Sequence, residues 1–146
     1  MGRVFFNTRK NIHNLTASYT CLESDSGKTF IVLPAATTDI TLPAPGDVSD
    51  GWNCTVILQS DSGFGGDALM DQKVNIDMSS GTANVGIIHG GDAGGSDQAV
   101  TGDDFINCTA AASPGDRFEF ITDGTRWYVT GWVIDSSECP FGTATA

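Results

Sequence analysis

The sequence predicts an all-β fold, either an antiparallel β-sandwich or a jelly-roll-like barrel of about ten short strands. Apolar and β-branched runs recur about every ten residues, and clusters of Gly, Pro, Asp and Ser separate them. No segment keeps the i, i+3, i+4, i+7 apolar spacing of an amphipathic helix over about three turns. The chain has 146 residues, of which 40% are hydrophobic, so it can form a single domain with its own core.

Each candidate strand is an apolar or β-branched run bounded by turn residues. Many of the 18 glycines lie in the connections, where turns require a positive φ. Two polar, Gly-rich segments, 60–71 and 90–104, are expected to be exposed loops at one end of the sheets. The candidate strands, in chain order, are 17–22, 28–33, 39–42, 52–59, 73–78, 84–89, 98–101, 105–111, 117–122 and 125–134.

The clearest single element is a β-hairpin over 117–130. Asp123-Gly124 fits a two-residue type I′ loop, which pairs Thr122 with Thr125, Phe120 with Trp127 and Phe118 with Val129. One face of the hairpin is then an apolar core patch made of Phe118, Phe120, Trp127 and Val129. The opposite face is either plain solvent surface or the rim of a subunit contact, and Gly131 is expected to form a bulge before Trp132. That face carries Arg117, Glu119, Ile121, Arg126, Tyr128 and Thr130.

The charge balance excludes several classes of partner. With 18 acidic and 7 basic residues, the formal net charge is −11, which argues against nucleic-acid binding because phosphate contacts depend on Lys and Arg. No apolar run approaches the roughly 20 residues of a membrane-spanning helix. The first residues also lack the long apolar stretch of a secretory signal peptide, so we expect a chain made in the cytoplasm.

The basic residues are concentrated at the N-terminus, since no acidic residue occurs before Glu23. We therefore divide the chain into a basic arm (1–16), an all-β body (17–134) and a C-terminal tail (135–146). The basic residues of the arm either decorate a first strand or reach a negatively charged partner. The candidate partner-binding residues are Arg3, Val4, Phe5, Phe6, Arg9 and Lys10.

The sequence gives no catalytic or cofactor-binding motif. It has no nucleophile elbow, HExxH, Walker loop or dinucleotide fingerprint. His13, in the arm, and His89, at a strand end, are more typical of ordinary surface histidines than of general bases. We therefore predict a protein that is not an enzyme and binds no cofactor.

No metal site is predicted either, because the cysteines stand far apart and the histidines have no ligand spacing. Cys54 and Cys108 lie in apolar runs and should be buried, while disulfide pairing among Cys21, Cys54, Cys108 and Cys139 stays open. Calcium is a weaker alternative, because the Gly/Asp-rich loops 63–67 and 90–97 loosely echo calcium repeats. Its oxygen ligands would be Asp92, Asp97, Asp103 and Asp104.

The order of several short motifs resembles tailed-phage virion proteins. Tyr19-Thr20-Cys21-Leu22, followed by Asp25-Ser26-Gly27-Lys28-Thr29-Phe30, is similar to an opening in which a Tyr-x-Leu strand precedes an Asp-x-Gly-Lys turn and an apolar strand. The motifs at 40–43 and 51–58 come next, and 114–116, 123–124 and 127–131 look like the closing hairpin of the same modules. The resemblance covers roughly 17–58 and 112–133, and the middle, 60–104, matches no known pattern.

Such modules occur in capsid decoration (cement) proteins and in head or tail fibres, commonly as homotrimers, and bring no catalytic residues. The short acidic chain shows no heptads, which favours a cement protein over a long fibre. The resemblance therefore implies a homotrimer on the virion capsid surface, with the basic arm on the major capsid protein. The alternatives are a receptor- or glycan-binding fibre module, whose sugar platform would use Trp52, Trp127 and Trp132, and, least favoured, a small hydrolase.

Overall fold

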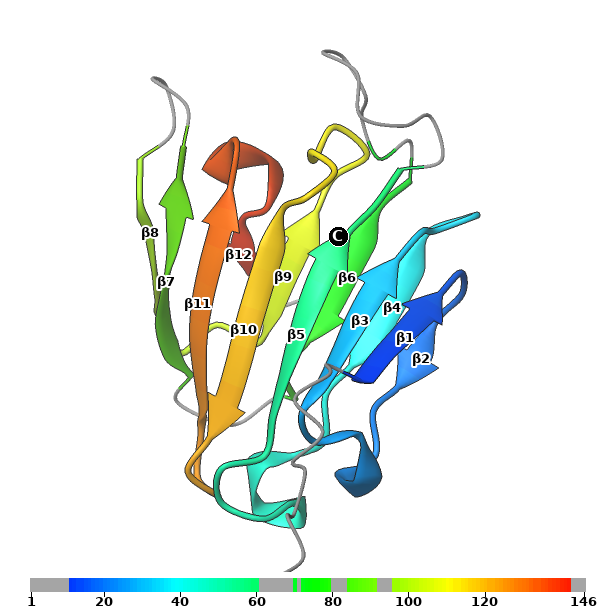
Figure 1. Ribbon diagram of the computed structural model, residues 1–146. Coiled ribbons are helices and arrows are strands. Elements are labelled where there is room, and N and C mark those ends of the chain that lie inside the picture. The colour runs from blue at the N-terminus through cyan, green and yellow to red at the C-terminus, as the bar shows by residue number, and fades with distance from the viewer. Residues whose placement is uncertain (1–10, 61–69, 71, 80–83, 92–95, 143–146) are drawn as a thin grey trace, which may run out of the picture.

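Two β-sheets stacked face to face make up the described part of the chain in a computed structural model (Figure 1). The structure describes residues 11–60, 70, 72–79, 84–91 and 96–142. Helical structure in these ranges is limited to three short 3-10 turns: η1 (Glu23–Asp25), η2 (Pro45–Asp47) and η3 (Ser136–Glu138). None of the helices described has the length and apolar character needed to cross a membrane. The predicted all-β sandwich is confirmed.

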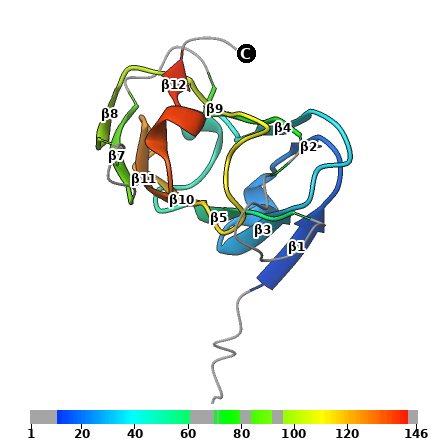
Figure 2. The same ribbon diagram turned by 90° about the horizontal axis from the view of Figure 1, so that it is seen from above.

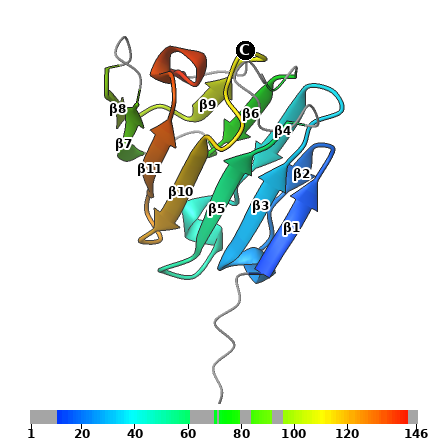
Figure 3. The same cartoon turned by 45° about the horizontal axis from the view of Figure 1, so that its top comes forward.

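The larger sheet has seven strands in the order β1-β3-β5-β10-β11-β7-β8, and Figure 3 shows most of them side by side. The smaller sheet has five strands in the order β12-β9-β6-β4-β2. The larger sheet contains β1 (Asn11–Leu15), β3 (Lys28–Val32), β5 (Asn53–Leu58), β7 (Val85–Gly90), β8 (Gln98–Thr101), β10 (Arg117–Thr122) and β11 (Trp127–Val133). The smaller contains β2 (Tyr19–Thr20), β4 (Thr38–Thr41), β6 (Val74–Asp77), β9 (Phe105–Cys108) and β12 (Phe141–Gly142).

Both sheets are mixed, which corrects the expectation of antiparallel sheets. From β1 to β6, each successive strand lies in the other sheet. Every second strand therefore returns to the same sheet in the same direction, so β1, β3 and β5 are parallel neighbours, as are β2, β4 and β6. Strand β7 is also parallel to β11. Only the later pairs, such as β10 with β5 and β11, are antiparallel.

The core lies between the sheets and is rich in aromatic side chains. Trp52 and Trp127 meet edge to face, with ring centroids 5.4 Å apart. The Trp52 indole nitrogen also donates to the carbonyl oxygens of Leu22 and Glu23, which satisfies its buried N–H. Burial of aromatic area on this scale is the main term that stabilises the sandwich. The largest fully buried side chains include Trp52, Trp127, Phe30, Phe118, Phe120, Ile40, Leu42, Leu58 and Ile76.

The β10–β11 hairpin has the predicted faces but a different register. Thr122 pairs with Trp127, and Phe120 pairs with Val129, so the loop has four residues instead of two. The reason is Asp123, whose carboxylate accepts hydrogen bonds from the Thr125 and Arg126 amides and holds the wider loop. Since the shift is by two residues, every side chain keeps its side of the sheet.

Gly131 forms no bulge, because β11 pairs without interruption from Trp127 to Val133. A side chain at this position would have its Cβ 2.7 Å from Ile88 Cγ1 and 3.0 Å from Phe118 Cδ1. The glycine therefore makes room for the side chains of the two strands that flank β11 in the same sheet, β7 and β10.

Two strands lie in segments that the sequence analysis placed outside the body. β1 occupies 11–15 of the predicted arm and extends the seven-stranded sheet beside β3. β12 and η3 occupy the predicted tail, where Cys139 is fully buried. Both segments are short, and neither has the alternation that predicts a strand.

Candidate functional site

The outward side of the seven-stranded sheet is apolar over much of its width. Side chains alternate along each strand, so β10 and β11 bury Phe118, Phe120, Trp127 and Val129 and turn the residues between them outward. Register then sets the outward side chains of neighbouring strands next to one another. We call the apolar, aromatic, histidine and charged members of this set the outer face: Ile12, Ile31, Ile57, Val85, Ile87, His89, Arg117, Glu119, Ile121, Tyr128, Trp132 and Ile134. The polar Asn53, Thr55 and Thr130 lie among them.

Most of the exposed large hydrophobic residues that the structure describes belong to the outer face. Trp132 is 43% exposed, Ile121 49% and Tyr128 41%, and Ile12 and Ile134 are more exposed still. The one other such residue, Leu22, lies just before η1. Contiguous exposed apolar surface of this kind marks a site where another molecule binds.

Arg117 and Glu119, the two formally charged residues of the outer face, are paired with each other. The Arg117 guanidinium lies over the Trp132 ring, 4.6 Å from its centroid, and its Nη2 is 3.1 Å from Glu119 Oε1. On the other side of Trp132, His89 Nδ1 lies 3.4 Å from Asp97 Oδ1. The arrangement leaves little local net charge on a chain whose total is −11.

The hairpin loop fixes the position of Tyr128 on the outer face. Its hydroxyl donates to Asp123 Oδ2 at 2.8 Å, and this hydrogen bond raises the pKa of Tyr128. The pKa of Asp123 is lowered, first by the Thr125 hydroxyl and also by the Thr125 amide and Tyr128. The ring is therefore oriented in advance, which reduces the entropy lost when a partner covers it.

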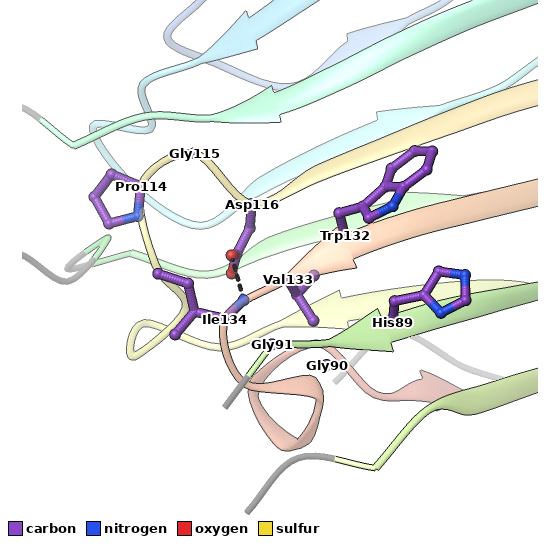
Figure 4. Close-up of a pocket in the computed structure, with 9 residues that line it drawn as sticks. All are labelled: His89, Gly90, Gly91, Pro114, Gly115, Asp116, Trp132, Val133 and Ile134. Atoms are coloured by element: carbon purple, nitrogen blue, oxygen red, sulfur yellow. Dashed lines mark hydrogen bonds between the residues drawn. The ribbon is translucent and has the colours of Figure 1, made fainter. Parts of the chain in front are cut away.

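A depression of about 370 Å³ lies at one end of the outer face (Figure 4). Trp132, His89 and Ile134 form its apolar and aromatic lining, together with Gly90, Gly91, Pro114, Gly115, Asp116 and Val133. A second depression, of about 380 Å³, lies at the middle of the sheet and includes Ile121 and Tyr128. The outer face therefore has two depressions that can receive side chains of a partner.

Asp116 is the one buried carboxylate in the first depression, and it accepts hydrogen bonds from backbone amides. Its two oxygens accept hydrogen bonds from the Ser113 amide at 3.0 Å and the Ile134 amide at 2.9 Å, the second of which Figure 4 shows. Burial raises the pKa of Asp116, and the two amides oppose that effect. The carboxylate thus anchors the ends of β10 and β11, and both its oxygens are occupied.

Three residues of the segment from Tyr19 to Phe30, Tyr19, Asp25 and Lys28, form a structural cluster. The Asp25 side chain is buried and accepts from Lys28 Nζ at 2.5 Å, the Leu22 amide at 2.8 Å and the Tyr19 hydroxyl at 2.9 Å. Burial alone would raise its pKa, but these three donors outweigh burial and lower it. The motif therefore fixes the turn between β2 and β3.

The predicted partner-binding residues, Arg3, Val4, Phe5, Phe6, Arg9 and Lys10, lie outside the described residues. His13, expected in the arm, lies in β1 and packs against Tyr19 and Phe30, with centroid distances of 5.1 and 5.8 Å. His89 lies on the outer face beside Trp132. His13 therefore lies on the inward side of the larger sheet, whereas His89 lies on its outward side.

All four cysteines are free, and all four are buried, as expected for Cys54 and Cys108. In the described ranges, no group of three or more His, Cys, Asp or Glu side chains could hold a metal ion. Of the candidate calcium ligands, Asp92 lies outside those ranges and Asp97 contacts His89. Burial, with the charges of Asp77 and Asp103, raises the pKa of Asp104.

The three tryptophans do not form one platform. Trp52 and Trp127 are buried against each other, and only Trp132 is on the outer face. The sequence analysis missed the wider apolar surface, including Ile12, Ile57 and Ile87. The apolar run in β5 could have indicated this surface, because strands with unbroken apolar runs are covered on both sides.

Comparison with protein-family models and with curated proteins finds no match for the chain.

Proposed function

We propose that this protein is a structural component of a tailed-phage virion, a capsid decoration or cement protein that acts by adhesion to neighbouring protein copies. The observation that carries the proposal is the outer face, with its apolar side chains and internally paired charges. The resemblance of the Tyr19 to Phe30 and 112–133 segments to phage modules supports the virion setting. Adhesion needs a rigid scaffold and no reacting groups, which agrees with Asp116 being occupied by backbone amides.

The outer face is proposed to bind a second copy of the chain, within a homotrimer. Copies with a net charge of −11 repel one another, so they can approach only where the local charge is small. The outer face meets that condition because Arg117 and Glu119, its two formally charged residues, are paired with each other. Its aromatic and isoleucine side chains then supply the apolar area that a stable contact requires.

The basic residues at 3, 9 and 10 are proposed to contact the major capsid protein on the virion surface. They precede β1, which is one of the two edge strands of the seven-stranded sheet in the described part of the chain. An edge strand can accept a further strand from another protein. Binding to the assembled lattice alone would stabilise that lattice by mass action.

The decisive experiment is sedimentation of the purified full-length chain with capsids of the phage that encodes it. The cement role predicts co-sedimentation that saturates at a fixed copy number per capsid subunit. A deletion of residues 1–10, which stops short of β1, should abolish capsid binding and leave the β-sandwich folded by circular dichroism. Absence of binding by the intact chain would refute the cement role.

A second candidate is a glycan-binding fibre module, which the exposed Trp132 beside His89 and the depression of Figure 4 favour. It predicts that an oligosaccharide from the host surface quenches the fluorescence of Trp132, with the buried Trp52 and Trp127 unaffected. Trp132→Phe should remove the quenching. A flat titration with such oligosaccharides would count against this candidate.

A further inference from the structure

The C-terminal segment brings two cysteines of distant sequence into direct register. β12 is antiparallel to β9, with Phe141 opposite Ile106 and Gly142 opposite Phe105. The same register continues beyond the strand, because the Asn107 amide donates to the Pro140 carbonyl at 2.9 Å and the Thr109 amide to the Glu138 carbonyl at 2.8 Å. Cys108 and Cys139 therefore lie opposite each other between these two bonds. Figure 2 shows β9 and β12 at the same end of the sandwich.

The position between the two hydrogen-bonded pairs is the one that brings side chains closest. In antiparallel pairs, non-hydrogen-bonded positions have Cα atoms roughly 4.5 Å apart, which lies at the short end of the disulfide range of about 4.4–6.8 Å. The Cys108 thiol is also the main cause that raises the pKa of Cys139, as expected for two neighbouring sulfurs. Cys108 is 1% exposed and Cys139 0%, so no solvent separates them.

We propose that Cys108 and Cys139 are an oxidative modification site that forms a cross-strand disulfide when the chain meets a small-molecule disulfide. The Cys139 thiolate attacks the oxidant, RSSR, and expels RS⁻, giving a mixed disulfide. The Cys108 thiolate then attacks the Cys139 sulfur and expels the second RS⁻. The protein loses two protons and two electrons, and the oxidant is reduced to two thiols.

Access to the thiols requires local opening of the C-terminal segment. The neighbouring Cys108 thiol and burial raise the pKa of Cys139, so its thiol stays protonated and does not react in the closed state. However, β12 has two residues and is an outermost strand of the five-stranded sheet in the described part of the chain. Short edge elements open at low free-energy cost, so the oxidant can reach the pair without global unfolding.

The disulfide would fasten the C-terminal segment to the sandwich. The closed loop contains the whole β10–β11 hairpin, so the bond restricts the unfolded chain over a long segment. The bond also adds to contacts already at this point, since the Thr109 hydroxyl donates to the Glu138 carboxylate and the Gln98 side chain donates to the Ser136 carbonyl. The inference rests on the thiols alone and holds whether or not the proposed function is correct.

Cys21 and Cys54 provide a matched comparison within the same chain. Both are buried, and burial is the main cause that raises their pKa values, that of Cys21 to about 12. However, Cys54 lies in β5 of the larger sheet, whereas Cys21 follows β2 and its amide donates to Thr41 of the smaller sheet. No shared ladder sets these two opposite each other, so they should stay reduced.

The test is incubation of the full-length native chain with oxidised glutathione, followed by intact mass and non-reducing peptide mapping. We expect a loss of two hydrogen atoms, a cross-linked peptide containing Cys108 and Cys139, and a Tm higher by about 5 °C or more. The Cys21→Ser/Cys54→Ser variant should oxidise in the same way, and the Cys108→Ser/Cys139→Ser variant should not. A chain that stays reduced, or a bond that joins other cysteines, would overturn the proposal. If a variant fails to fold, the peptide map of the unaltered chain still decides the question.

Discussion

Trp132 offers the most direct test of the outer face as a contact between copies. A tryptophan can bury up to about 250 Å², and the 43% exposure of Trp132 leaves roughly 100 Å² for a partner to cover. At about 25 cal/mol per Å², Trp132→Ala should weaken each contact by about 2.5 kcal/mol, or roughly 70-fold. Sedimentation velocity over a range of protein concentrations measures this shift directly.

Leu22→Ala is the matched control, since Leu22 is 57% exposed but lies off the outer face. Its self-association should equal that of the unaltered chain. Circular dichroism should show both variants folded, because each side chain points to solvent. The reasoning fails if Trp132→Ala associates as strongly as the unaltered chain, or if Leu22→Ala weakens association equally.

Two further predictions concern the scaffold. Asp25→Asn should lower the free energy of unfolding by about 1–3 kcal/mol at neutral pH. Because the folded-state pKa of Asp25 is lowered, its contribution is present above the ordinary carboxyl pKa and is lost as pH falls through the folded-state value. Urea titrations should therefore show the difference from the unaltered chain shrinking in acid, and a pH-independent difference would contradict this. Gly86→Ala should cost about 3 kcal/mol or more, since its Cβ would lie 2.1 Å from the Val129 carbonyl oxygen. Gly91→Ala, whose Cβ would be 3.5 Å from the nearest carbonyl oxygen, should be tolerated. Thermal unfolding of the two glycine variants measures the difference.

The predictable part of the fold is the part that local pattern determines. The strands at 117–122 and 98–101 have the predicted bounds, because turn residues flank them closely. Side-chain parity in the β10–β11 hairpin was also correct although the register was not. The side of the sheet to which a residue points depends on alternation alone, whereas the strand register depends on which hydrogen bonds Asp123 makes.

Strand direction could not be predicted, because it depends on the path between the sheets. The connection from β3 to β4 passes from one sheet to the other, and nothing in the Leu33 to Thr37 segment distinguishes such a crossing from a hairpin turn within one sheet. β1 and β12 were missed for a related reason. Each is an edge element whose strand pairing comes from a partner far away in the sequence, so its own residues carry little strand pattern.

The hairpin part of the candidate site could be predicted from the sequence, but the flanking strands that complete it could not. The sequence analysis identified the 117–130 hairpin face as a surface or subunit rim, and the structure adds β5 and β7 on either side of it. Those flanking strands carry Ile57 and Ile87, which pattern alone assigns to a core. Only the register shows that they point outward, Ile57 beside Arg117 and Ile87 beside Thr130.

The mixed topology and the apolar outer face have a common physical explanation. An antiparallel sheet can tolerate water on one side and then alternates apolar and polar residues, whereas parallel strands normally have both faces covered. β3 and β5 are parallel neighbours, and their outward residues Ile31 and Ile57 are directly paired. Part of the outward apolar surface therefore lies on parallel strands that normally need cover, and no described element of the sandwich lies over it (Figure 3). Because the rest of the chain is strongly acidic, nonspecific clustering is opposed by repulsion, and only a partner that matches this face gains enough apolar contact to bind.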